Sequence, residues 1–200
     1  MSEQKRDDKN MEDKRDMEDK RQSVREMVLV AVGPDAPGRV KAISSFIHEA
    51  GGNLEDSRMA MLAGEFALIL LFSGNDAVIE DVRRRKSAFE RELGFIINLK
   101  ATVRVSRPDA LGYELRVGGV DQPGIVLAVS EVLANLEINV VSLESRVTPA
   151  AFSGTPMFTL TASLAVATRP LMATLREELE RVCDERNLSY GLEPTDLPRS

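Results

Sequence analysis

The sequence is poor in the side chains that most often build catalytic centres and metal sites. Its 200 residues include one cysteine, Cys183, one histidine, His48, and no tryptophan. A single cysteine cannot form an internal disulfide, and one cysteine with one histidine cannot supply a zinc ligand set. The sequence also contains no P-loop, Gly-x-Ser-x-Gly or His-Glu-x-x-His motif. We therefore expect a protein that is not an enzyme and that has no metal or other cofactor.

Aromatic residues, net positive charge and long apolar runs are also scarce. Aromatic residues make up 4% of the chain and the formal net charge is −6, which disfavours base stacking and attraction to phosphate backbones. No apolar run approaches the roughly 20 residues that span a bilayer, and the N-terminus lacks the apolar stretch of a secretory signal. These absences predict a soluble cytoplasmic protein that binds neither nucleic acid nor membrane directly.

The first 25 residues form a separate compositional block. Residues 11–21 are almost all charged, with both signs interleaved, so they have little apolar surface to bury. Their spacing of acidic and basic residues also allows a solvated helix. We expect a disordered or loosely helical tail, with a partner-binding helix as the alternative.

An internal repeat organises the remaining chain. The apolar run 27–32 precedes Asp35-Ala-Pro-Gly38 and a stripe of apolar residues at helical spacing, and residues 113–117 precede Asp121-Gln-Pro-Gly124 and a second stripe. The two copies align without a gap as far as the Asn that begins the next predicted strand. The aligned pairs are Asp35 with Asp121, Pro37 with Pro123, Gly38 with Gly124, and Asn53 with Asn139.

Each copy continues with a predicted hairpin, a second amphipathic helix and a last strand. The order β-α-β-β-α-β, twice over, predicts an α+β protein of two tandem ferredoxin-like domains with antiparallel sheets. In such a domain both helices cover one face of the sheet, and the other face and the edge strands stay open unless something covers them. We expect the two repeats to cover each other, and we also expect a dimer of such pairs. The predicted divisions are a tail (1–25), domain 1 (26–105), a linker (106–112), domain 2 (113–195) and a C-terminal tail (196–200).

The repeated loop has the chemistry of a small ligand site. A glycine at a helix start leaves backbone N–H groups open to a carboxylate, the helix dipole adds partial positive charge, and the Asp could hold an ammonium group. An amino acid carries both charges. The alternative is that Asp-x-Pro-Gly only caps and turns the chain. The candidate residues are Asp35, Ala36, Pro37 and Gly38 in the first copy, and Asp121, Gln122, Pro123 and Gly124 in the second.

Asn53 and Asn139 are candidate ligand residues at the start of the second strand of each copy. The Asn amide offers a donor and an acceptor at the rim of the sheet, where the loop of a neighbouring module could lie. Alternatively, each Asn only supports a turn or a left-handed backbone.

Other polar clusters favour structural roles. The basic run 83–86 lies between acidic residues in a predicted helix, which indicates a solvated helix face, with a docking patch for an acidic partner as the alternative. Asp56 and Arg58 are interpreted as members of cross-strand charge pairs, and Cys183 as a small core residue.

The order of elements, the Asp-x-Pro-Gly loop and the Asn-initiated strand resemble the ACT domain, a small amino-acid-sensing module. The tandem pair resembles the glycine cleavage system transcriptional repressor family. Stretches similar to that family are 28–38, 55–61, 153–160 and 183–185. The resemblance implies a regulator that binds a small amino acid, with glycine as the candidate, and that restrains a transcriptional activator by protein contact. We also expect the chain to form a homodimer.

The resemblance also implies where the ligand binds. In ACT domains the loop before the first helix of one module and the start of the second strand of another hold it, so Gly38 and Gly124 would meet Asn53 and Asn139 across an interface. The charged tail has no counterpart in the family, and the first helix of the second copy ends without the Gly-Gly pair of the first. The competing hypothesis is a ligand-independent protein–protein interaction module.

Overall fold

The structure, a computed structural model, describes residues 24–103, 110–167 and 169–196. Most of the expected N-terminal tail, most of the expected linker and residues 197–200 lie outside these ranges. The chain divides into two compact units, residues 1–105 and 106–200, which we call module 1 and module 2 and describe separately. Among the described helices, none combines the length and apolar character needed to cross a bilayer.

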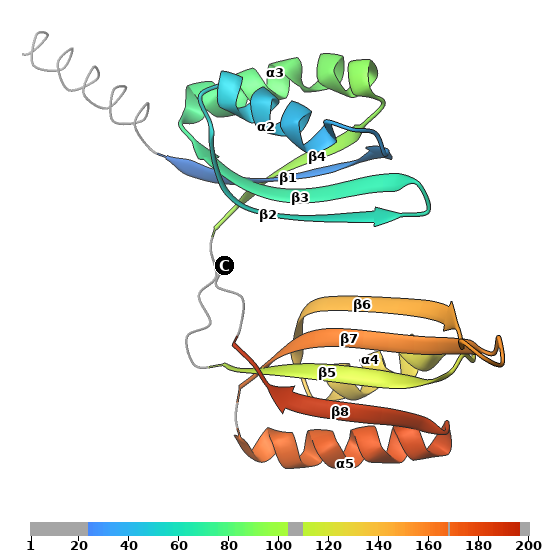
Figure 1. Cartoon of the computed structure of the whole chain (residues 1–200). Coiled ribbons are helices and arrows are strands. Elements are labelled where there is room, and N and C mark those ends of the chain that lie inside the picture. Colours follow the sequence, from blue (N-terminus) through green and yellow to red (C-terminus); the bar gives the residue numbers. More distant parts are fainter. Residues whose placement is uncertain (1–23, 104–109, 168, 197–200) are drawn as a thin grey trace, which may run out of the picture. The chain divides into compact units, whose positions relative to one another are not determined.

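Module 1 is a four-stranded antiparallel sheet with two helices on one face (Figure 1). The strand order is β2-β3-β1-β4, so the strand that follows each helix lies at an edge of the sheet. Its elements are β1 (Arg25–Pro34), α2 (Arg39–Glu49), β2 (Asn53–Leu62), β3 (Glu65–Gly74), α3 (Asp76–Leu93) and β4 (Ile96–Thr102).

Module 2 repeats this plan with the strand order β6-β7-β5-β8. The predicted α+β fold with two βαββαβ units is confirmed. Leu111 and Gly112, which we expected in the linker, are the first residues of β5, and Arg25, expected in the tail, begins β1. The elements of module 2 are β5 (Leu111–Val120), α4 (Ile125–Asn135), β6 (Asn139–Pro149), β7 (Pro156–Val166), α5 (Arg169–Glu185) and β8 (Leu188–Pro194).

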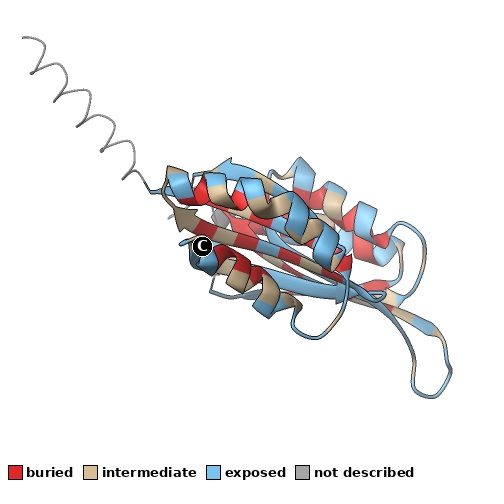
Figure 2. Ribbon diagram, turned by 90° about the horizontal axis from the view of Figure 1, so that it is seen from above, coloured by how far each residue is buried: buried red, intermediate tan, exposed pale blue. Residues whose placement is uncertain are grey.

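Each module has its own core between its helices and its sheet. Alternate residues of β1 and β3 point at the helices, as the two-residue period of a strand requires. Figure 2 shows this alternation along the strands and the buried stripes of the helices. Cys183 belongs to the core of module 2 and is 1% exposed, which confirms its interpretation as a core residue. Fully buried side chains of module 1 include Met27, Leu29, Ile43, Ile47, Phe66, Leu70 and Phe72.

Local signals in the sequence define the ends of α3. The side chain of Asn75 accepts a hydrogen bond from the backbone N–H of Val78 at the N-terminus, and Gly94, at φ 71°, ends the helix in a left-handed conformation. The carboxylate of Glu90 accepts hydrogen bonds from Lys86 Nζ at 2.7 Å and from the backbone N–H of Ile97 at 2.8 Å. Both bonds favour the charged carboxylate and hold the pKa of Glu90 below its ordinary value, against the opposing effect of burial.

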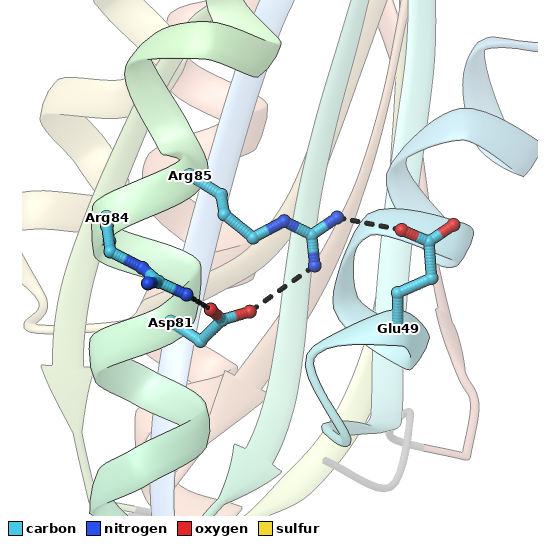
Figure 3. A network of polar contacts seen from close by, with 4 residues as sticks. All are labelled: Glu49, Asp81, Arg84 and Arg85. Atoms are coloured by element: carbon cyan, nitrogen blue, oxygen red, sulfur yellow. Dashed lines mark hydrogen bonds and ion pairs between the residues drawn. The ribbon is translucent and has the colours of Figure 1, made fainter.

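Arg84 and Arg85 of the basic run 83–86 in α3 form ion pairs within module 1 (Figure 3). Arg85 donates to Glu49 of α2 at 2.7 Å and to Asp81 at 3.3 Å, and its guanidinium lies 5.3 Å from the centre of the Phe46 ring. Arg84 also pairs with Asp81, and this hydrogen bond is the largest cause of the lowered pKa of that carboxyl. The contacts support a helix face stabilised by local pairs over a docking patch.

The two hairpins differ at their tips. Ala63 and Gly64 connect β2 to β3, both at positive φ (52° and 86°), as in a type I′ turn. The longer loop between β6 and β7 is closed by hydrogen bonds from Ala150 N to Thr155 O at 2.8 Å and from Gly154 N to Ala150 O at 2.9 Å. This closed loop leaves the Phe152 side chain fully exposed.

The interpretation of Asp56 as a member of a cross-strand charge pair is wrong. Asp56 and Arg58 lie two residues apart on β2, and their charged groups are 3.8 Å apart along that strand. Their cross-strand neighbours on β3 are Leu71 and Ile69. The pair therefore shares one face of the sheet and does not connect two strands.

Candidate functional site

The two Asp-x-Pro-Gly loops have the same backbone conformation. Gly38 and Gly124 are the N-cap residues of α2 and α4, at φ 90° and 87°. This left-handed conformation favours glycine over residues with a side chain. No described side chain caps either helix, so the hypothesis that Asp35 or Asp121 caps the helix is wrong.

Without a side-chain cap, backbone donors of both first turns stay open. The intrahelical bonds begin with Ala42 N to Gly38 O at 2.9 Å and Ala128 N to Gly124 O at 3.0 Å. Within the described parts of the chain, the N–H groups of the two residues before each of these alanines have no acceptor. These donors belong to Val40, Lys41, Val126 and Leu127, and the neighbouring Asp, Pro and Gly of each loop are exposed.

Each loop is held by the hairpin of its own module. Asp35 N donates to Gly64 O and Asp121 N donates to Pro156 O, both at 2.9 Å. In module 2 the side chain of Gln122 also donates to the carbonyl oxygen of Arg186 at 2.7 Å. These bonds fix the loops before any ligand is present, so little ordering would be needed on binding.

An arginine lies beside the glycine turn in both modules, but from different parts of the chain. In module 1, Arg39 Nε donates to Pro34 O at 3.0 Å and its guanidinium lies 4.9 Å from the Phe95 ring centre. In module 2, Arg186 Nη1 lies 3.8 Å from the position that a Cβ on Gly124 would take. The Arg186 guanidinium forms no ion pair with another described residue. Neither arginine was predicted as a site residue, because the two do not align in the repeat.

Asn53 and Asn139 begin β2 and β6, as predicted. Neither has a positive φ, so the alternative of a left-handed Asn is wrong. Asn53 Nδ2 donates to Glu55 Oε1 at 2.8 Å, and the same oxygen accepts from Ser73 Oγ at 2.6 Å. The Asn139 side chain, by contrast, has no hydrogen-bond partner among the described residues. The two Asn positions are therefore not equivalent.

Within one module, the Asn and the glycine loop lie at opposite ends of the sheet. Asn53 pairs with Ser73 at one end of the hairpin, whereas Pro34, which precedes the loop, pairs with Glu65 at the other end. Strands of 10 residues place these ends roughly 30 Å apart. No single ligand the size of an amino acid can contact both. A site that uses both features must be assembled from two modules.

A separate groove of ≈ 390 Å³ lies between α4 and α5 of module 2. It contains Arg186 but none of the ten predicted ligand residues. Arg181 in its wall donates to Glu178 at 2.7 Å and to Glu185 at 3.0 Å, and these hydrogen bonds raise the pKa of Arg181. In the described ranges, no three His, Cys, Asp or Glu residues are grouped so as to hold a metal ion.

Comparison with known proteins agrees with this architecture. Two family models, both described as the ACT domain, match residues 25–100 and 113–183. The chain is 32% identical over 125 residues to the glycine cleavage system transcriptional repressor of Escherichia coli (strain K12), and equally to that of Shigella flexneri. Each match spans 62% of this chain and 66% of the repressor, slightly less than two thirds of its length.

Two solved structures are similar to most of the chain. An unknown protein from Galdieria sulphuraria is 35% identical with a TM-score of 0.77, and the match covers 87% of this chain and 100% of the other. The crystal structure of a proposed glycine cleavage system transcriptional repressor is 25% identical with a TM-score of 0.67, covering 87% and 99% of the two chains. With both modules matched along most of their length, the chain belongs to the ACT-domain family as a tandem of two ACT domains.

Proposed function

We propose that the protein is a non-catalytic cytoplasmic regulator that binds a small amino acid, with glycine as the first candidate, between ACT modules. The bound state would alter its contact with a partner that activates transcription. The similarity to glycine cleavage system transcriptional repressors supports the regulatory class and the choice of glycine.

The observation that carries the proposal is the pair of preorganised glycine turns with open backbone donors. Among the described residues, each turn presents two N–H groups without acceptors at the positive end of a helix, and the glycine itself adds no side chain there. Such a surface suits a carboxylate. The exposed Asp35 and Asp121 carboxylates, one beside each turn, supply negative charge for an α-ammonium group.

Module 2 is the stronger candidate for binding. Arg186 adds a positive charge beside Gly124, whereas Arg39 of module 1 is already stacked on Phe95. The Asn139 amide has no hydrogen-bond partner in the described part of the chain, whereas the Asn53 amide donates to Glu55. These differences support unequal occupancy, with the loop of module 2 and Asn139 contributing most. Because the two lie at opposite ends of one sheet, each would contact a ligand held together with a second module.

The test is a thermal-shift panel of all twenty amino acids on the full chain at millimolar concentration. A ligand that binds only the folded state adds to the free energy of unfolding by mass action, about 2.7 kcal/mol when its concentration is 100 times its Kd. The melting temperature rises as a result. We expect glycine or another small amino acid to stand out. If none of the twenty raises the melting temperature, the proposal fails.

The second candidate function is a ligand-independent interaction module. It is favoured by the edge strand β6, all of whose residues are exposed, and by Phe152 at the tip of a closed loop. Exposed strand edges and single aromatic anchors are common protein-binding features. This candidate predicts no response in the amino-acid panel and a partner whose binding is lost on Phe152→Ala but kept on Gly124→Ala.

A further inference from the structure

The sheet faces that point away from the helices differ sharply between the two modules. In module 1 the central strands β1 and β3 present aliphatic side chains on this face. In module 2 the corresponding side chains are polar or small. The aliphatic residues of module 1 include Val30 (38% exposed), Val32 (39%), Ile69 (48%) and Ile96 (77%), together with the half-buried Val28 and Leu71.

The strand registers allow the open sheet faces of the two modules to be compared position by position. Val30 pairs with Ile69 in module 1, and the equivalent pair in module 2 is Arg116 with Thr161. Val28 pairs with Leu71, whereas Glu114 pairs with Ser163. The same backbone positions therefore carry an apolar surface in one module and a polar surface in the other.

An aliphatic sheet face of this kind is unfavourable in water and marks an interface. The polar face of module 2 is a poor partner for it. Burying Glu114, Arg116 and Glu144 against aliphatic side chains would remove them from water without new hydrogen bonds, which is costly. A partner with matching chemistry is the same face of a second chain.

The charged residues at the edges of the face fit such self-association. Asp56 of β2, Leu71, Val28 and Lys100 of β4 form one row across the sheet. When two copies pack face to face about a two-fold axis parallel to the strands, β2 of one copy lies over β4 of the other. Each Asp56 then lies opposite Lys100 of the other copy, so the dimer contains this charge pair twice.

The next two rows also match under this symmetry. The second row runs from Arg58 through Ile69 and Val30 to Asn98, so the Arg58 guanidinium lies opposite an amide oxygen that can accept from it. The third row begins at Ala60 and ends at Ile96, so a small side chain lies opposite a large one.

The size of the face is sufficient for a stable dimer. Three strands of 10 residues and one of 7, about 4.8 Å apart and about 3.3 Å long per residue, cover roughly 600 Å² per copy. Two copies would bury about 1,200 Å² in total, which is the lower limit of standard stable interfaces.

We propose that the open sheet face of module 1 is a homodimer interface, formed by Val28, Val30, Ile69 and Leu71 at its centre and by Asp56 and Lys100 at its edges. The same face of module 2 stays outside the interface. This inference is independent of whether the chain binds an amino acid.

The first test compares lysine substitutions at equivalent positions of the two modules. In sedimentation equilibrium the wild-type full chain is expected to be a dimer at micromolar concentration. Ile69→Lys should give a monomer, because it places two like charges in the apolar centre, and the matched control Thr161→Lys should stay dimeric. A monomeric wild type, a dimeric Ile69→Lys or a monomeric Thr161→Lys overturns the proposal.

The second test reverses charges at the edges and does not depend on how well Ile69→Lys folds. Asp56→Lys and Lys100→Glu should each raise the dimer Kd by about tenfold or more, because each places like charges opposite one another. The double variant should return the Kd close to the wild-type value. Circular dichroism of every variant checks that the fold is kept. Single variants that dimerise normally, or a double variant without recovery, contradict the two-fold arrangement.

Discussion

The backbone N–H of Asp35 donates a 2.9 Å hydrogen bond to the carbonyl oxygen of Gly64, which fixes the glycine loop of module 1 at the turn of its own hairpin. Asn53 begins the same hairpin at the other end. Asp121 and Pro156 repeat the bond in module 2. A ligand that touches both a glycine loop and a strand-initiating Asn must therefore bridge two modules, so its binding should be coupled to their association.

Gly124→Ala should remove the amino-acid response of module 2. The added methyl group lies 3.8 Å from Arg186 Nη1, where the proposed ligand carboxylate would bind, and the φ of 87° adds backbone strain of about 1 kcal/mol. Gly154→Ala is the matched control, because Gly154 also has a positive φ (68°) and open space around it. Urea unfolding should show similar destabilisation in both variants, whereas only Gly154→Ala should keep the thermal shift. Equal responses to ligand would contradict the site.

Asn139→Ala should weaken amino-acid binding more than Asn53→Ala. The Asn139 amide has no partner among the described residues, whereas the Asn53 amide already donates to Glu55. Loss of a ligand hydrogen bond should raise the Kd by about tenfold. Isothermal titration calorimetry of both variants measures the difference. The reverse ranking would place the main site in module 1.

Glu90→Gln should destabilise module 1 in a pH-dependent way. The native-state pKa of Glu90 is lowered from its ordinary value of 4.5, chiefly by Lys86. A lowered native pKa stabilises the fold above the unfolded-state pKa, and the contribution is lost as the pH falls through the native pKa. In urea unfolding at pH 7, the wild type should have a higher free energy of unfolding than Glu90→Gln. This difference should decrease as the pH falls below about 4.5.

The control for this pH dependence is Glu92→Gln in the same helix. Glu92 is exposed and forms no ion pair with a described residue. Its substitution should change the free energy of unfolding by less than about 0.5 kcal/mol at either pH. A pH-independent difference between wild type and Glu90→Gln would show that the carboxylate charge contributes nothing.

Arg85→Ala should destabilise module 1 more than Arg83→Ala, although both residues belong to the same basic run. Arg85 connects α3 to Glu49 of α2 (Figure 3) and packs on Phe46. Arg83 is exposed and forms no hydrogen bond or ion pair with a described residue. We expect a cost of about 1 kcal/mol for Arg85→Ala and close to none for Arg83→Ala. Thermal melts of both variants decide this, and equal melting temperatures would favour the docking-patch alternative.

Cys183 should resist thiol reagents in the native state. It is 1% exposed, and burial raises the pKa of its thiol, so little thiolate is available. Because the sequence has no other cysteine, the reaction with a chromogenic disulfide reports on module 2 alone. The rate should follow the unfolding of module 2 as urea increases. Immediate labelling of the native protein would contradict the burial.

Much of the fold was predictable because its signals are local. The alternation of apolar residues in strands, the helical spacing of 40–50 and 126–136, and the Gly and Asn residues at turns depend only on near neighbours in the chain. Comparison of the two copies strengthened each prediction, because the same order of elements occurs twice. Domain boundaries were less certain, and Leu111 and Gly112 continue β5 into the expected linker.

The candidate site was predictable in its parts but not in its arrangement. The glycine turns and the strand-initiating Asn residues lie where the repeat placed them. The approach of Arg186 to Gly124 was missed, because these residues are distant in sequence and the equivalent position in module 1 is not an arginine. The capping role proposed for Asp35 was wrong, because residue type alone does not determine where a side chain points.

The sequence by itself determined the class of the protein, its two copies of one supersecondary unit and the positions of their turns, because backbone preferences and apolar periodicity act over a few residues. Only the tertiary structure decided that Asn53 and the glycine loop lie at opposite ends of one sheet, and that Glu90 binds the N–H of Ile97. These relationships depend on strand register and helix packing, which bring together residues that no local pattern connects.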